Sequence, residues 1–210
     1  MAHQNRNQVN KRIPLPRKGT KYVARALSHH TKAVPLVIAI RDMLKLAQTS
    51  REVNHLMKQG LLKINGKTPK DIRESIKLFG LLQADKTYQL TLSPTHKFTF
   101  TETTSKNRPI KVVNKIARPN NKIQVNGHDG SNILLDATKA KDIKTNDTLL
   151  LSPDNKLSKH LPLDKAKTGF VFAGKYAGHE GKISKVDNNK VTIAFKDKEA
   201  TLPAKQVLVR

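Results

Sequence analysis

The sequence predicts an α+β protein that is mostly β, with a basic N-terminal arm, a small helix–helix–hairpin unit, a β-rich central domain and a C-terminal barrel. Apolar residues recur at helical spacing only in the first third of the chain. Short alternating runs separated by glycine or asparagine turns follow them. Hydrophobic residues make up 37% and aromatic residues 4% of the 210 residues, without tryptophan, which favours several small cores. The expected segments are 1–33, 34–92, 93–167 and 168–210.

The expected arm, residues 1–33, contains eight lysines and arginines and no acidic residue. Pro14 and Pro16 interrupt any helix or strand, and the segment has no apolar period. We therefore expect the arm not to fold alone and to become ordered on a nucleic acid. A solvating tail or a localisation signal is the alternative. The candidate phosphate ligands here are Arg6, Lys11, Arg12, Arg17, Lys18, Lys21 and Arg25.

The first expected helix begins at Pro35, because proline suits the first helical position. Apolar residues at helical spacing give it one face, formed by Leu36, Ile40, Met43, Leu44 and Ala47. Arg41, Lys45 and Gln48 recur at i, i+4 and i+7 and form a second face. We take Arg41 and Lys45 as candidate phosphate ligands, the alternative being an ordinary solvated face.

The second expected helix starts with a capping box in which Thr49 is the cap and Glu52 reaches back. Its apolar face consists of Val53, Leu56 and Met57, and its basic face of Arg51, His55 and Lys58. A strand at 61–64 and the Asn65-Gly66 turn follow Gly60, which is a typical helix stop. The candidate ligands of this part are Arg51, Lys58, Lys63 and Lys67.

The central segment, residues 93–167, shows weak alternation, as in Phe98-Thr99-Phe100, and a turn at 126–130. It carries no catalytic signature, since its carboxylates form no paired acid motif. We expect a β-rich domain.

The C-terminal segment contains short strands around glycine-rich turns, which predicts a small barrel. Gly174, Gly178 and Gly181 allow sharp turns or a close approach to a phosphate. An NTPase loop is excluded, because Tyr176 stands where that motif requires glycine and Ile183 replaces its hydroxyl. An RNA-recognition sheet is excluded too, because it needs two aromatic strand motifs over a βαββαβ plan, and neither is present. With the glycines, the candidate ligands are Lys175 and Lys182.

The charge indicates the class of partner. Lysine and arginine number 40 against 16 acidic residues, a net charge of +24, and a polyanion that binds such a chain releases counterions. Cysteine is absent, which excludes thiol catalysis and cysteine-based zinc sites, and the eight histidines are dispersed. The longest uncharged apolar run, 34–40, is too short to span a bilayer, and 33 polar, basic residues precede it. We expect a soluble, intracellular protein with no metal, cofactor, membrane or small-molecule substrate.

The runs 36–45 and 60–67 resemble the S4-type RNA-binding module, two short helices followed by a strand ending in Ile-Asn-Gly-Lys. The preceding run from His29 and His30 to Leu36 resembles the same region of the archaeal and eukaryotic ribosomal protein family S4e. Residues 168–183 resemble a KOW motif, in which Gly181 takes the position that requires glycine. The chain has no basic tail after this motif, which favours the archaeal form of the family.

The resemblance implies a structural constituent of the small ribosomal subunit, located in the cytoplasm, that binds ribosomal RNA and neighbouring ribosomal proteins and performs no catalysis. It adds His29 and His30 to the candidate RNA-binding residues and implies an SH3-like form for the barrel. The few aromatic residues argue against base stacking as the main mode of binding, so we expect recognition of RNA shape and phosphates.

Two other functions remain open at this point. The first is a free RNA-binding or chromatin-like regulator, which would bind many nucleic acids and would not sediment with ribosomes. The second is an RNA-modifying enzyme with an S4-type module. Such an enzyme needs a catalytic domain of roughly 150 residues, for which the segments above leave no room.

Overall fold

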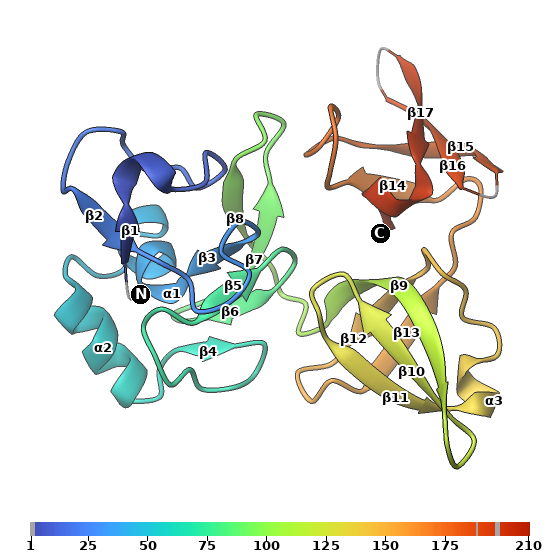
Figure 1. Ribbon diagram of the computed structural model, residues 1–210, viewed down its shortest axis with the longest axis horizontal. Helices are drawn as coiled ribbons and strands as arrows, with labels where there is room; N and C mark the ends of the chain where they lie inside the picture. The colour runs from blue at the N-terminus through green and yellow to red at the C-terminus, as the bar shows by residue number, and fades with distance from the viewer. Residues whose placement is uncertain (1–2, 188, 196–197) are drawn as a thin grey trace. The chain divides into compact units, whose positions relative to one another are not determined.

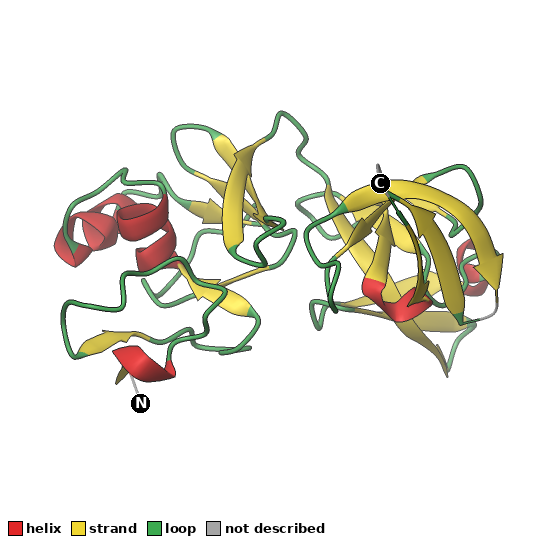
Figure 2. Cartoon of the chain, turned by 90° about the horizontal axis from the view of Figure 1, so that it is seen from above, coloured by secondary structure: helices red, strands yellow, loops and turns green. Residues whose placement is uncertain are grey.

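The computed structural model describes residues 3–187, 189–195 and 198–210. The chain divides into two compact units between Lys106 and Asn107, each described here by itself (Figure 1). In the first unit the helical residues 36–58 lie together, apart from a short helical turn near the N-terminus, whereas the second unit consists mainly of strands and loops (Figure 2). The predicted α+β fold with a majority of β structure is confirmed in this coarse form.

The first unit begins with a small antiparallel sheet of β1 (His3–Asn5) and β2 (Tyr22–Ala24), with the 3-10 turn η1 (Arg6–Gln8) between them. Buried apolar side chains anchor this segment, namely Ile13, Val23 and Ala26. Backbone hydrogen bonds also connect it to later parts of the unit: the amide of Phe98 donates to the carbonyl of Arg12, and that of Leu27 to the carbonyl of Arg73.

The structure corrects the expectation of an arm that does not fold, because residues 3–33 are a folded part of the first unit. The physical reason is that its few apolar residues bury against elements from later in the chain. Pro14 and Pro16 interrupt regular structure, as expected, but they do not prevent this packing.

The helical region starts after β3 (Ala33–Pro35) with α1 (Leu36–Ile38), which continues as one π-turn, η2 (Ala39–Met43). Residues 36–40 are all buried, so this stretch is enclosed on every side rather than amphipathic. The helical conformation ends at Leu44, since Lys45 has a φ of 57°. The expected basic face with Arg41, Lys45 and Gln48 one turn apart is thus wrong.

The second helix, α2 (Ser50–Lys58), matches the sequence-based expectation closely. The hydroxyl of Thr49 accepts a hydrogen bond from the Glu52 amide at 3.2 Å, and the Glu52 carboxylate accepts one from the amide of Gln48 at 2.8 Å. Val53 and Met57 are buried, while Arg51 and Lys58 are exposed on the opposite face.

An antiparallel sheet in the order β4-β6-β7-β8 completes the first unit, and β5 pairs with β3. Asn65 and Gly66 follow β4 with φ values of 51° and 83°, as a tight turn of this type requires. The expected boundary at 92/93 falls inside the β7–β8 hairpin, whose registers include Leu92 with Phe98. The strand bounds are β4 Lys63–Ile64, β5 Ser75–Lys77, β6 Leu81–Gln83, β7 Thr87–Leu92 and β8 Phe98–Glu102.

The second unit contains two five-stranded antiparallel sheets. The central sheet has the order β11-β10-β9-β12-β13, and its core includes Ile110, Val112, Val125 and Leu149. Its elements are β9 Arg108–Arg118, β10 Lys122–Gly127, β11 Asn132–Asp136, α3 Ala137–Ala140, β12 Thr148–Leu151 and β13 Leu157–Leu161.

The C-terminal sheet has the order β17-β16-β15-β14-β18, so the last strand pairs with the first. Val171, Ile183, Val191, Ile193 and Val207 lie in its core. Its elements are β14 Thr168–Val171, β15 Glu180–Asp187, β16 Lys190–Ala194, β17 Glu199–Pro203, the 3-10 turn η3 Ala204–Gln206 and β18 Val207–Val209.

The two sheets of the second unit are joined by buried polar contacts. Lys111 of β9 donates from Nζ to the carbonyls of Ala204 (2.7 Å) and Val207, and the Val209 amide donates to Thr148 Oγ1 at 2.9 Å. The sequence-based division at 167/168 therefore lies within one compact unit. That residues 168–210 form a separate domain stays a prediction.

Candidate nucleic-acid interface

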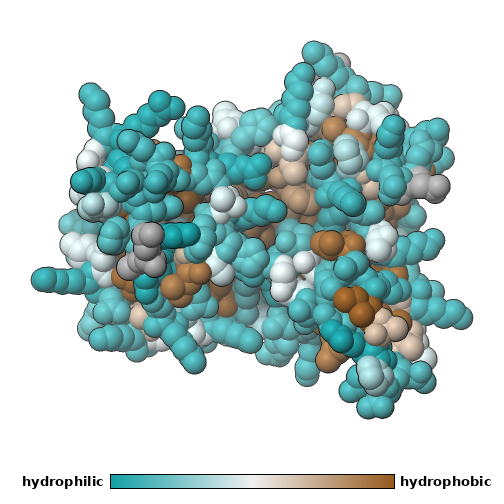
Figure 3. Space-filling model, in the orientation of Figure 1, coloured by the Kyte–Doolittle hydropathy of each residue, from teal (hydrophilic) through white to brown (hydrophobic). Residues whose placement is uncertain are grey.

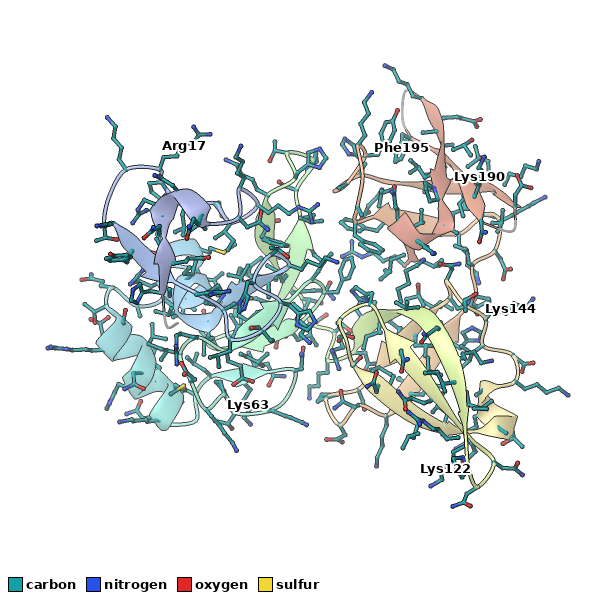
Figure 4. The ribbon with its side chains drawn as sticks, viewed as in Figure 1. Arg17, Lys63, Lys122, Lys144, Lys190 and Phe195 are labelled. Carbon is teal, nitrogen blue, oxygen red and sulfur yellow. The ribbon has the colours of Figure 1, made fainter. Side chains whose placement is uncertain are left out.

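Cations that lack an acidic partner are spread over the first unit. Arg51 and Lys58 are exposed on α2, and Lys63 and Lys67 are exposed on and after β4. Within the described residues, none of these four forms an ion pair, so their charge is directed only at solvent. Lys63 lies at the outside of the first unit (Figure 4).

The N-terminal segment adds a second group of exposed cations without acidic partners among the described residues, comprising Lys11, Arg17, Lys18 and Lys21. Arg17 stands on the loop that precedes β2 (Figure 4). Because this segment is folded, these side chains are held on a fixed surface and not on a loose tail. A fixed surface reduces the conformational entropy that binding would otherwise cost.

Arg6 holds the protein's own loop together. Its guanidinium donates to the carbonyls of Thr20 and Pro16, both at 2.7 Å, and to the Thr20 hydroxyl at 2.9 Å. These bonds occupy most of its donors, which leaves little for a phosphate.

Arg41 is neutralised by its neighbour in the sequence. Its guanidinium contacts the Asp42 carboxylate through two hydrogen bonds, at 2.8 and 3.0 Å, and the Ser50 hydroxyl at 3.1 Å. The hydrogen bond with Asp42 raises the pKa of Arg41 above its ordinary value, against the opposing effect of burial. Of the predicted lysine and arginine ligands in the described chain, Arg41 is the one with an acidic partner.

The remaining predicted ligands of the first unit differ in their surroundings. His30 contacts the Ala26 carbonyl through Nδ1 at 2.7 Å, and His29 has a φ of 52° in an exposed turn. Arg12 and Arg25 are half-buried, and Lys45 is exposed just after the helical region ends.

The three predicted glycines of the C-terminal segment differ in burial and in the space around them. Gly178 is buried, and its amide donates to the Val171 carbonyl at 2.7 Å, so it is not available to a ligand. A Cβ on Gly181 would lie 2.5 Å from the carbonyl oxygen of Ala194, which explains why only glycine fits there. Gly174 is exposed with a φ of 85°. Lys175 and Lys182 are exposed beside them.

Several basic residues of the second unit were absent from the sequence-based set. Lys122, Lys144 and Lys190 are exposed on the outside of the second unit (Figure 4). Their only signal in the sequence is the positive charge of the segment. In contrast, Lys115 is turned inward, and its Nζ donates to the carbonyls of Ala140 (2.7 Å) and Ile143 (2.6 Å).

Two acidic side chains of the second unit, Asp129 and Asp147, are buried and engaged in structure. Asp129 is buried and accepts a hydrogen bond from Arg108 at 2.6 Å and from the Ser131 amide at 2.9 Å. Burial opposes ionisation, but the Ser131 bonds and the Arg108 charge lower the pKa of Asp129 below its ordinary value. Asp147 similarly contacts His160 at 2.7 Å. These contacts hold loops of the second unit together.

Over the described ranges, no cluster of three or more histidine, aspartate or glutamate side chains could bind a metal ion. None of the described helices combines the length and the apolar character needed to cross a bilayer. Most of the visible surface is hydrophilic (Figure 3). The candidate site is thus a dispersed cationic surface.

Small β-rich units covered with cations that lack acidic partners are typical of the ribosomal class of proteins. The chain belongs to the ribosomal family S4e, whose family model matches residues 84–156. A small ribosomal subunit protein eS4 from Methanococcus maripaludis is 30% identical over 203 residues, covering 88% of this chain and 83% of the relative. One from Methanocella arvoryzae is 29% identical over 192 residues, covering 88% of this chain and 80% of the relative.

A solved structure agrees with this assignment. The crystal structure of the 30S ribosomal protein S4e from Thermoplasma acidophilum matches with a TM-score of 0.70 and 25% identity. The match covers 85% of this chain and 94% of that one. The expected family and its archaeal type are thereby confirmed.

Proposed function

We propose that this chain is a structural constituent of the small ribosomal subunit, which binds ribosomal RNA through backbone phosphates and helps that RNA to fold. The observation that carries the proposal is the distribution of exposed cations over both units without acidic partners. Each such cation that meets a phosphate releases a condensed counterion, which is the main source of affinity for a chain with a net charge of +24.

The strongest proposed phosphate ligands are the exposed cations whose charge is uncompensated. Arg6 and Arg41 rank lower, because their donors are already used within the protein. Gly178 contributes by shaping the turn before β15, and Gly181 by letting β15 lie close to Ala194, and neither is proposed as a direct contact. The proposed ligands are Lys11, Arg12, Arg17, Lys18, Lys21, Arg25, His29, His30, Lys45, Arg51, Lys58, Lys63, Lys67, Gly174, Lys175 and Lys182.

The helical region with β4 is proposed to be an S4-type module, and residues 168–210 a KOW element in an SH3-like barrel. The first is supported by the capped helix α2 and by the Asn65-Gly66 turn directly after β4. The second is supported by the pairing of the last strand with the first, the 3-10 turn before β18 and the crowded Gly181.

We infer that the chain performs no catalysis, takes no cofactor or small-molecule substrate, and works in the cytoplasm within the ribosome. Neighbouring ribosomal proteins are its proposed protein partners. The names of the relatives described above, which are small ribosomal subunit proteins, support these inferences.

Crosslinking in cells tests the proposal directly. The tagged chain is crosslinked to RNA by ultraviolet light, purified under denaturing conditions, and the attached RNA is sequenced. We expect reads concentrated in a few regions of small-subunit ribosomal RNA, and co-sedimentation of the chain with that subunit. Reads from many unrelated RNAs, with the chain absent from isolated subunits, would instead indicate a free regulator.

A further inference from the structure

A cavity of about 860 Å³ opens beside β1 and β2 in the N-terminal segment, within the size range of small-ligand sites, about 300–1,000 Å³. Its lining contains the rings of His3 and Tyr22, several side-chain amides and the Arg25 guanidinium, but no acidic residue. The phosphate contacts proposed above do not use the aromatic or amide groups. These aromatic and amide groups therefore indicate a ligand other than a backbone phosphate alone.

The aromatic part of the lining is exposed although it is ordered. The rings of His3 and Tyr22 meet edge to face with their centroids 4.7 Å apart, and Lys21 Nζ lies 5.4 Å from the Tyr22 centroid. Tyr22 still exposes 49% of its surface. An aromatic ring that is fixed by its neighbours and open to solvent is the usual platform on which an unstacked base of single-stranded RNA rests.

Three of the four amide side chains in the lining are unoccupied by the protein, whereas Asn10 already donates to the Thr31 carbonyl. Among the described residues, the side chains of Gln4, Asn5 and Gln8 make no hydrogen bond. Each carries both donors and an acceptor, as base edges do, and amide side chains therefore pair readily with them. Arg25 is half-buried in the same lining without an ion pair in the described chain, and it supplies a positive charge for one phosphate.

We propose that this cavity binds one unstacked nucleotide of an RNA strand. The base lies against Tyr22, its edge meets the amides of Gln8 and of Asn5, which pairs with Tyr22, and its phosphate meets Arg25. The proposal rests on the RNA-binding function above and adds to it a site that reads a base. An acidic peptide would satisfy Arg25 but would make no use of the exposed ring and the free amides.

Binding of short RNAs to the full chain tests this site. Fluorescence anisotropy is measured with labelled homopolymers of about seven nucleotides, one for each base, over a range of salt. We expect Tyr22→Ala to weaken binding about tenfold, the effect of losing one stacked base, without a change in the salt slope. Tyr22→Phe keeps the ring and should bind like the wild type, as should Leu27→Ala, which removes an exposed apolar side chain outside the cavity.

The remaining variants test the phosphate contact and the base preference separately. Arg25→Gln should reduce the salt slope by about one, the value for one lost phosphate contact. Gln8→Ala should change the order of preference among the four RNAs. If Tyr22→Ala binds RNA as tightly as the wild type does, the nucleotide site is overturned and the phosphate-binding function is left intact. The same conclusion follows if a heptaglutamate peptide displaces the labelled RNA as well as unlabelled RNA does. A wild-type chain that binds none of the RNAs at low salt would count against the RNA-binding function itself.

Discussion

Lys111 is buried between the two sheets of the second unit, with 2% of its surface exposed. Its ammonium group has three carbonyl acceptors, on Asn146 (3.2 Å), Ala204 (2.7 Å) and Val207. Burial lowers the pKa of Lys111 to about 7, and the nearby charge of Asp147 opposes that shift. The residue therefore fixes the two sheets to each other but does so at an energetic cost when it is charged.

This burial makes stability depend on pH. Because the pKa of Lys111 is lower in the folded than in the unfolded chain, the unfolded chain binds more protons between about pH 7 and 10. The free energy of unfolding should consequently rise with pH across this interval, by up to a few kcal/mol. Urea denaturation at several pH values measures the slope. Lys111→Met should reduce the slope, and an unchanged slope in that variant would assign it to other groups.

Gly181 offers a second test at the level of one residue. Gly181→Ala places a Cβ 2.5 Å from the Ala194 carbonyl oxygen and 2.6 Å from Ile193 Cγ2. We expect a loss of about 1–3 kcal/mol in stability, since strands must separate to accept the methyl group. Gly60→Ala is the matched control, because nothing lies within 4 Å of its Cβ and only a φ of +74° opposes the change. Because Gly60→Ala reports the cost of backbone strain alone, a Gly181→Ala variant as stable as the wild type would contradict a steric requirement at Gly181.

Among the elements, the N-terminal segment depends on side chains that bury against later parts of the chain. Ile13 and Val23 expose 5% and 6% of their surfaces, whereas Leu27 in the same segment exposes 51%. The segment is therefore held in place by a few apolar contacts and by hydrogen bonds such as that from Phe98 to the Arg12 carbonyl.

This packing predicts resistance to proteolysis in the absence of RNA. Trypsin should cut the wild type slowly at Arg12 and Arg17, because cleavage requires the segment to open. Ile13→Asp should accelerate cleavage about tenfold or more, since burying an unpaired carboxylate is costly. Leu27→Asp, at an exposed position, should leave the rate unchanged, and mass spectrometry of timed digests follows both variants. Rapid cleavage of the wild type at these sites would show that the segment is loose.

For the molecule as a whole, the excess of cations governs how binding responds to salt. The logarithm of the affinity for ribosomal RNA should fall linearly with the logarithm of the salt concentration. Arg51→Gln and Lys58→Gln should each reduce that slope by about one, if each residue contacts one phosphate. Filter binding over a series of salt concentrations measures this.

A paired lysine provides the control for this experiment. Lys86 forms an ion pair with Glu102 at 3.0 Å, and that hydrogen bond raises the pKa of Lys86. Lys86→Gln should leave the salt slope nearly unchanged, because the wild-type charge is already compensated. Equal reductions for Lys86→Gln and Lys58→Gln would mean that total charge decides the slope and that position does not.

Features that depend on a few neighbouring residues could be predicted from the sequence. The capping box of Thr49 and Glu52, the turn at Asn65-Gly66 and the need for glycine at 181 all agree with the structure. The excess of positive charge, and the class of partner that it indicates, are likewise properties of composition.

Only the tertiary structure decided which cations use their hydrogen-bond donors within the protein itself. Arg6 and Lys111 are cations like the others in the sequence, but long-range contacts with Thr20, Ala204 and Val207 engage them. The N-terminal segment has too few apolar residues to fold alone, yet it packs onto partners distant in the sequence. Local spacing determines helices, caps and turns, and composition determines charge. Burial depends on contacts between residues far apart along the chain, which composition and spacing do not encode.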